Sequence, residues 1–241
     1  MGIVNSARYR TRYAINSTKR YLKVYRELPN QVSFVDNAIF KASPETDISD
    51  HLNVIFSLAM AKKPKTILEL GTRGGESTRV LTLAANLIGA KGYSADLSEA
   101  PEWLNEQENW NHFVADDTKF CELLKESWPN GDKYSGIDLL FLDTSHFYDH
   151  TMQELSLYWD LLNDDGVLLL HDTNCTAEMT RRFSGNANEG WDNQRGVIRA
   201  IEDFFDCEID EKQFLSKISL GRGATALTHY PWNNGLTVIF K

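Results

Sequence analysis

Acidic residues close a series of short, mainly apolar runs in this sequence, and such positions are suited to binding a cationic group. Each run ends in at least one carboxylate, and in one case a histidine precedes it. Carboxylates that gather in one place repel one another unless a positive group lies among them, so the series indicates a ligand site. Single members can instead cap helices or accept hydrogen bonds from loop amides. The end residues are Glu69, Asp96, Asp116 with Asp117, Asp143, and His171 with Asp172.

The segment after the first run, ILELGTRGGEST, has the composition of a tight ligand-binding turn. Gly71, Gly74 and Gly75 allow a sharp turn and close approach of a ligand to the backbone. The segment is neither GxGxxG nor a P-loop, because no Gly-Lys-Ser/Thr follows. Glu69 makes a phosphate a poor neighbour and an ammonium group a good one. Asp96, at the end of the second run, has the position that binds ribose hydroxyls in folds of this class.

The elements that position these residues follow from an alternation of strand and helix patterns. The apolar runs have the length of strands buried on both faces, and helical segments separate them. This pattern predicts a doubly wound α/β domain in which the carboxyl ends of parallel strands share one edge of the sheet. The expected strands are residues 66–70, 92–96, 112–116, 137–143 and 166–172, and the expected helices between them are residues 76–89, 117–127 and 149–162.

The rest of the chain predicts a closing hairpin and an N-terminal extension. Residues 217–230 and 235–241 have the pattern of an antiparallel pair, which would complete a mostly parallel seven-stranded sheet. Residues 1–48 predict a helical extension and residues 49–241 the ligand-binding domain. Tyrosines spaced by four residues in the extension would line one helix face, and we expect that face to pack on the domain or in a homo-oligomer.

Composition excludes several classes of function. The chain has 241 residues and a net charge of −9; residues 1–26 carry +7, so the remainder carries −16, which disfavours nucleic-acid binding. No apolar run approaches the length of a membrane span, and the N-terminus lacks the apolar region of a secretory signal. Cys121, Cys175 and Cys207 form no zinc-binding pattern. We therefore expect a cytoplasmic protein without a membrane partner.

The segments ILELGTRGGEST, YSAD, VADD and IDLLFLD, taken in this order, resemble class I S-adenosylmethionine-dependent methyltransferases. Within that superfamily the chain is similar to the metal-dependent small-molecule O-methyltransferases of the catechol O-methyltransferase type, and to related natural-product and sugar O-methyltransferases. The resemblance covers about residues 65–175 and the terminal hairpin. It implies S-adenosyl-L-methionine as cofactor and a small hydroxylated molecule, such as a sugar or secondary metabolite, as methyl acceptor.

The resemblance also assigns cofactor contacts. Glu69 and the turn from Gly71 to Gly75 would hold the methionine part, with Ser77 assisting from the helix start, and Asp96 would take both ribose hydroxyls. The remaining expected contacts are Asp116 beside the adenine, Asp117 adjacent to it, and Asp143.

A divalent metal is implied by the same resemblance. The carboxylates that end strands four and five in the family match Asp143 and Asp172. The acidic or amide neighbour common in the family is replaced here by His171 and Thr173, with Asn174 one residue further. Carboxylates with the Asn174 carbonyl suit Mg²⁺, whereas His171 as a ligand would favour Mn²⁺, Fe²⁺ or Zn²⁺. His171 can equally be an imidazole held by hydrogen bonds outside the ligand set.

His146, three residues after Asp143, is the candidate general base. The family carries lysine or histidine at that offset, and imidazole titrates near neutrality, where it can take the acceptor proton. Capping of the helix that follows is the alternative role. Two further functions stay open, a metal-independent methyltransferase and a non-catalytic protein that keeps the fold. A nicotinamide-dependent oxidoreductase is disfavoured by Glu69 and by the absence of GxGxxG.

Overall fold

The computed structural model of the chain describes residues 46–126, 136–174 and 195–241. The expected N-terminal extension, apart from residues 46–48, lies outside the described residues. Most of the polar segment between residues 174 and 196 lies outside them as well. Among the described residues, no helix is both long and apolar enough to cross a membrane.

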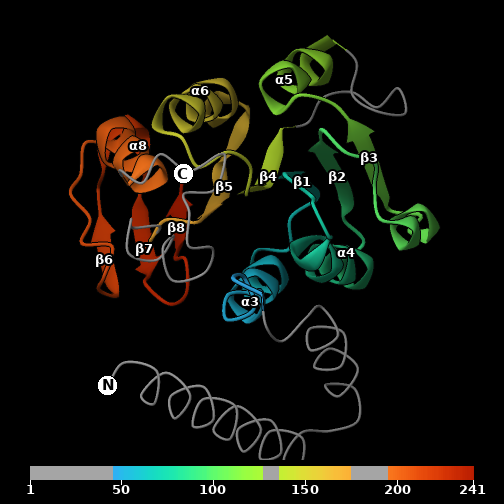
Figure 1. Ribbon diagram of the computed structural model, residues 1–241, viewed down its shortest axis with the longest axis horizontal. Coiled ribbons are helices and arrows are strands. Elements are labelled where there is room, and N and C mark those ends of the chain that lie inside the picture. Colours follow the sequence, from blue (N-terminus) through green and yellow to red (C-terminus); the bar gives the residue numbers. More distant parts are fainter. Residues whose placement is uncertain (1–45, 127–135, 175–194) are drawn as a thin grey trace, which may run out of the picture. The chain divides into compact units, whose positions relative to one another are not determined.

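The domain is built on one eight-stranded sheet with the order β3-β2-β1-β4-β5-β8-β7-β6 (Figure 1). The first five strands in this order pair in parallel, and the remaining pairs are antiparallel. The expected doubly wound α/β fold with an antiparallel C-terminal part is therefore confirmed. The parallel strands are β1 (Thr66–Leu70), β2 (Lys91–Asp96), β3 (Trp110–Val114), β4 (Ile137–Leu142) and β5 (Leu162–His171).

The sheet has one strand more than the sequence predicts, because residues 217–230 do not form a single strand. This segment folds as the end of β6 (Leu215–Ile218), a short 3₁₀ turn (Gly221–Gly223) and β7 (Ala226–Tyr230). Arg222 in the turn has a φ of 55°, which reverses the chain so that β6 and β7 pair with each other. The closing strand β8 (Leu236–Phe240) then inserts between β5 and β7.

Helices cover both faces of the sheet, as Figure 1 shows. On one face lie α5 (Asp117–Glu126), α6 (Tyr148–Tyr158) and α8 (Gly196–Phe205), which bury a continuous core with alternate residues of the strands. On the other face lie α3 (Leu52–Lys62) and α4 (Glu76–Ile88), which pack against each other. Successive side chains of a strand point to opposite faces of the sheet, so a residue's position in the strand decides which helices it packs against. Members of the first core are Leu68, Leu70, Leu140, Leu170, Phe120, Leu155, Ile201 and Phe205.

Candidate functional site

The β1–α4 turn buries a carboxylate where the sequence predicts a cofactor contact. Glu69 is fully buried on the α4 face of β1, and its two carboxylate oxygens accept hydrogen bonds from Ser77 Oγ at 2.7 Å and Thr78 Oγ1 at 2.6 Å. Burial raises the pKa of Glu69 to about 8, although the two hydroxyls oppose this shift. Glu69 and Ser77, both expected to hold the methionine part of the cofactor, thus contact each other, and their contact with the cofactor stays a prediction. Thr78 was not singled out from the sequence, although it is the next hydroxyl of the same helical turn.

Glycine is required at the start of this turn. Gly71 has a φ of 88°, and a Cβ added there would lie 2.0 Å from the carbonyl oxygen of Asp143. Gly75, with a φ of 83°, is the residue before the first turn of α4. The end of β1 therefore lies directly against the end of β4. This contact brings the glycine turn to the segment that contains Asp143 and His146.

Asp96 organises the same turn from the neighbouring strand. Its Oδ2 accepts hydrogen bonds from the backbone N–H groups of Thr72 at 2.7 Å and Arg73 at 2.9 Å, and its Oδ1 accepts one from Ser98 N–H at 2.8 Å. Burial alone would raise the pKa of Asp96, but these three donors together hold it below its usual value. The carboxylate is therefore ionised at neutral pH. It lies at the carboxyl edge of the sheet, where the sequence predicts the ribose contact.

Asp116 and Asp117 begin helix α5 instead of ending strand β3, which stops at Val114. Asp116 Oδ1 accepts hydrogen bonds from the backbone N–H of Thr118 at 3.0 Å and from its hydroxyl at 2.6 Å, the arrangement of a helix cap. The Asp117 carboxylate turns to helix α6 and lies 2.7 Å from His150 Nε2. The structure thus gives both residues a local structural role. Their expected contacts near the adenine stay predictions.

The carboxyl ends of β4 and β5 bring together the three residues expected to do the chemistry. One side-chain atom each from Asp143, His146 and Asp172 lies within 4.8 Å of the other two. The closest contact joins His146 Nε2 to the Asp172 carboxylate. His171 lies beneath them, with its Nδ1 3.3 Å from Asp143 Oδ1 and 3.5 Å from Asp172 Oδ2. Two carboxylates and two imidazoles therefore form one cluster, which we call the edge cluster.

Charge balance explains how the edge cluster holds buried carboxylates. Burial disfavours ionisation of Asp172, but His171 and His146 outweigh it and hold the pKa of Asp172 well below its usual range. Burial likewise disfavours an imidazolium at His171, yet Asp172 and Asp143 raise the pKa of His171 well above its ordinary value. The pKa of His146 is raised for the same reason, against the effect of burial. Burial raises the pKa of Asp143, although the nearby His171 opposes this shift. The cluster therefore favours positive charge beside Asp172.

Backbone strain marks the same position. Asp172 has a φ of 56°, in the left-handed region that an ordinary side chain occupies at a cost. It is 4% exposed, and it follows directly on the last residue of β5. Strain of this kind persists only where the surroundings determine it, and it is concentrated at functional sites. The turn at Asp172 aims its carboxylate back at His146.

Asn174 is anchored to the segment between β7 and β8. Its side-chain nitrogen donates a hydrogen bond to the Pro231 carbonyl at 2.7 Å, and its backbone N–H donates to the carbonyl of Asn234. An amide binds a metal through its oxygen, so these bonds do not involve the expected ligand atom. The structure also reveals His51, which sequence reasoning did not select: its ring contacts that of His171 edge to face, with centroids 5.5 Å apart. A lone histidine before a helix gave no signal of this contact.

A second buried cluster supports the segment after Asp143. Thr144 Oγ1 donates a hydrogen bond to Glu154 Oε1 at 2.7 Å, and Glu154 is 1% exposed on α6. Burial, together with a hydrogen bond to Asp117, raises the pKa of Glu154 well above its usual value. His150 Nε2 completes the cluster through Asp117. These contacts join α5, α6 and the end of β4, and none of them was predicted from the sequence.

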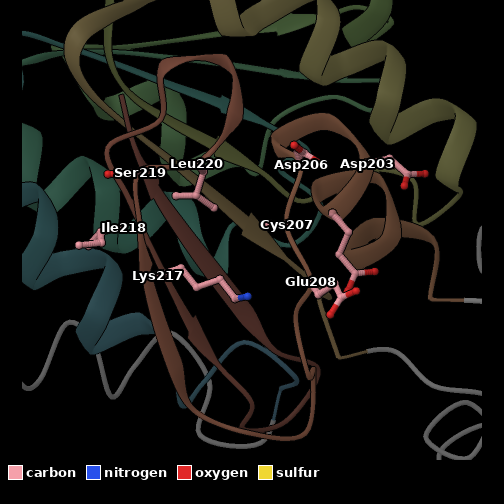
Figure 2. Close-up of a pocket in the computed structure, with 9 residues that line it drawn as sticks. Asp203, Asp206, Cys207, Glu208, Lys217, Ile218, Ser219 and Leu220 are labelled. Atoms are coloured by element: carbon pink, nitrogen blue, oxygen red, sulfur yellow. The ribbon is translucent and has the colours of Figure 1, made fainter.

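A hollow of about 520 Å³ lies elsewhere, between the end of α8 and β6. Figure 2 shows that acidic side chains surround it, among them Asp206 and Glu208, together with Lys217. Strand register shows at which edge of the sheet this hollow lies. Ile218 of β6 pairs with Ala226 of β7, which pairs with Phe240 of β8. Phe240 in turn pairs with Val167, near the amino end of the buried part of β5. The hollow therefore lies at the opposite edge of the sheet from the edge cluster.

Comparisons with known proteins agree with this geometry. Residues 68–173 match the family model of a methyltransferase domain. The chain is similar to an O-methyltransferase from Bacillus cereus solved with SAH, at 15% identity and a TM-score of 0.53, over 91% of this chain and 96% of that chain. It is also similar to the SAH-bound methyltransferase PaMTH1 from Podospora anserina, at 15% identity and a TM-score of 0.52, over 93% of this chain and 96% of that chain.

A third similar structure is the MycE methyltransferase of the mycinamycin biosynthetic pathway, solved with Mg, SAH and mycinamycin VI. The identity is 15% and the TM-score 0.53, over 89% of this chain and 54% of that chain. No curated protein matches the sequence. The domain match and the shared fold confirm the expected resemblance to class I S-adenosylmethionine-dependent methyltransferases and the prediction of a methyltransferase enzyme.

Proposed function

We propose that the protein is an S-adenosylmethionine-dependent O-methyltransferase that acts on a small hydroxylated molecule with the help of a divalent metal. The observation that carries the proposal is the edge cluster, in which Asp143, His146 and Asp172 converge within 4.8 Å. Its position supports the proposal, because Gly71 packs against the backbone of Asp143 at the same edge. Cofactor and acceptor groups would therefore meet between these two turns.

The residues of the β1–α4 turn fit S-adenosylmethionine. Asp96 is ionised and lies at the edge of the sheet, and by the resemblance its carboxylate would take the ribose hydroxyls. Glu69 is a buried carboxyl whose charge a neighbouring ammonium would stabilise. Because Gly71 has no side chain, the turn lies directly against the backbone of Asp143 at the end of β4. By the resemblance, Ser77, Asp116 and Asp117 complete the binding site.

The edge cluster fits a divalent cation. Asp143 and Asp172 supply carboxylate oxygens, and a cation bound between them would supply the positive charge that favours the ionised form of Asp172. A mixed set of oxygen and imidazole donors suits Mn²⁺, Fe²⁺ or Zn²⁺, and carboxylates with water suit Mg²⁺. Bound there, a metal would lower the pKa of the acceptor hydroxyl and orient it. Asn174 can add one carbonyl oxygen.

His146 would take the proton of the acceptor hydroxyl. Its side chain is 17% exposed, although both ring nitrogens are buried, and Asp172 holds the ring at this edge of the sheet. The sulfonium of the cofactor already activates the methyl group. The chain therefore has to align the acceptor, exclude water and remove a proton. These are tasks that the rigid ends of β4 and β5 can perform.

A second candidate, transfer without a metal, is favoured by one contact. His146 Nε2 lies directly against the Asp172 carboxylate, as in a base that an acid group orients. In that case Asp172 serves the imidazole and no cation is needed. Treatment with a chelator separates the two candidates.

The decisive experiment measures SAH formation from S-adenosylmethionine over a panel of phenols and methyl glycosides, with EDTA and then with added Mg²⁺ or Mn²⁺. Metal-assisted transfer predicts that EDTA abolishes SAH formation and that one of the ions restores it. In Asp143→Asn, neither ion should restore SAH formation. Activity that EDTA leaves unchanged would favour the metal-independent candidate. Absence of calorimetric binding of SAH to the wild-type protein would contradict both. We further propose that the enzyme works in the cytoplasm and without nucleic acid or membrane partners.

A further inference from the structure

Three aromatic side chains form an exposed group beside the edge cluster. Phe214 precedes β6, Tyr230 ends β7, and Trp232 lies in the β7–β8 turn. Their ring centroids are 5.4 Å apart for Phe214 and Tyr230, 6.2 Å for Phe214 and Trp232, and 5.7 Å for Tyr230 and Trp232. Each ring therefore contacts the other two. We call this group the aromatic platform.

The aromatic platform is open to solvent. Phe214 is 55% exposed and Trp232 is 51% exposed, and Tyr230 is half-buried. Covering large apolar side chains that are exposed together at a surface is favourable, because it removes their apolar area from water. Patches of this kind therefore mark sites of interaction. Since the rings are packed on one another, little side-chain entropy remains to be lost when a ligand covers them.

Strand register places the aromatic platform at the carboxyl edge of the parallel strands, where the edge cluster lies. Tyr230 pairs with Leu236, and Leu236 pairs with His171. The three residues are cross-strand neighbours and so share one face of the sheet, with Tyr230 and His171 two strand spacings, or about 10 Å, apart. The hollow at α8 and β6, by contrast, lies at the other edge. The platform is thus within the reach of one small molecule from the edge cluster.

Hydrogen bonds fix the platform to the residues that carry the cluster. Asn174 donates from its side chain to the Pro231 carbonyl at 2.7 Å, and Thr173 N–H donates to the Gly235 carbonyl. His51 Nε2 lies 2.9 Å from the Trp232 carbonyl, and the His51 ring contacts His171. The β7–β8 turn is therefore bound both to the segment after Asp172 and to the histidine beneath the cluster.

We propose that Phe214, Tyr230 and Trp232 bind the flat, apolar ring of the methyl acceptor and present its hydroxyl to the edge cluster. This inference rests on the proposed function. An aromatic surface attracts ring edges and flat ring faces. Charged or strongly hydrated acceptors would find few polar partners on it, since only the Tyr230 hydroxyl and the Trp232 indole N–H offer hydrogen bonds. The acceptor class is therefore a hydroxyl attached to, or close to, a planar ring system.

The test compares a planar probe and a saturated probe, 2-naphthol and decahydro-2-naphthol. Their hydroxyls are phenolic and alcoholic, so the variants of the platform, and not the probe pair alone, isolate the contact with the ring. Saturation-transfer NMR on the full chain with saturating SAH gives the dissociation constant of each probe. We expect 2-naphthol to bind at least tenfold more tightly than the saturated probe. Trp232→Ala and Phe214→Ala should each weaken 2-naphthol at least fivefold, and Trp232→Phe should retain most of the affinity.

The matched control is Leu87→Ala, which removes an equally exposed apolar side chain from α4, outside the aromatic platform. SAH affinity should be the same in all variants, which separates this test from that of the proposed function. Absence of 2-naphthol binding to the wild-type protein, or equal binding to all variants, would overturn the proposal. Self-association of the wild-type protein that Trp232→Ala abolishes, with 2-naphthol affinity unchanged, would assign the platform to a second copy of the chain and also overturn it.

Discussion

The backbone of Gly71 lies so close to Asp143 that a single added Cβ would be 2.0 Å from the Asp143 carbonyl oxygen. This contact joins the end of β1 to the end of β4, and through them the expected cofactor turn to the edge cluster. It is possible only because Gly71 has no side chain and adopts a φ of 88°. The geometry of the site therefore depends on a residue that does no chemistry.

Gly71→Ala should destabilise the protein strongly. The substitution combines the cost of a positive φ, about 1 kcal/mol, with a steric clash against backbone that cannot move freely. Gly89→Ala is the matched control, because Gly89 has a φ of 72° and nothing within 4 Å of the added Cβ. Thermal unfolding should show a midpoint temperature lowered by about 2–4 °C in Gly89→Ala and by clearly more in Gly71→Ala. Equal losses would mean that the clash relaxes without cost.

Glu69 should make the stability of the protein depend on pH. Burial raises its pKa from an ordinary value of 4.5 to about 8 in the folded state, so the folded protein binds this proton more tightly than the unfolded chain. The resulting stabilisation is fully present below pH 4.5 and is lost as the pH rises through 8. Urea unfolding from pH 5 to pH 9 should therefore show a decline for the wild type that Glu69→Gln lacks.

Glu106→Gln, an equivalent change at an exposed position, is the control for this measurement. It should keep the wild-type decline. Binding of S-adenosylmethionine near pH 7 should also release a proton from Glu69, because a cationic ligand favours the carboxylate. Calorimetry in two buffers of different ionisation enthalpy measures that release. Identical apparent enthalpies in both buffers would show that Glu69 keeps its proton.

Local sequence was enough to predict the strands, the glycine turn and the carboxylates at strand ends, because each depends on neighbouring residues. The extra strand was missed because residues 217–230 were expected to form one strand, and they are divided by a turn in which Ser219, Arg222 and Gly223 have positive φ. The contacts of Glu154, His51 and Trp232 could not be predicted, since each depends on the packing of distant segments. Asp117 shows the same limit: its neighbour in space, His150, lies 33 residues away.

Glu154 should support the edge cluster by positioning Thr144. Glu154→Gln keeps an oxygen for the Thr144 hydroxyl and a donor for Asp117, so it should change stability little. Glu154→Ala leaves Thr144 and Asp117 without this hydrogen-bond partner in a buried place. It should lower the free energy of unfolding by about 1–3 kcal/mol. Chemical denaturation of the two variants checks this difference. If Glu154→Gln were as unstable as Glu154→Ala, the hydrogen bonds would not be the cause.

His146→Asn should lower turnover by about 10²–10⁴-fold while leaving SAH affinity unchanged, because a general base acts on the acceptor and not on the cofactor. The control is His150→Asn, which alters a histidine one helical turn further along that contacts Asp117 outside the edge cluster. Its turnover should remain within a few fold of the wild type.

The pH profile adds a readout that a structural role would not change. Asp172 and Asp143 raise the pKa of His146 above its ordinary value, so the wild-type rate should rise with pH as the imidazolium loses its proton. His146→Asn should lose this rise along with most of its rate. Full turnover in His146→Asn would assign proton removal to another group. A rate lowered equally at every pH, with the rise retained, would make His146 a positioning residue for Asp172.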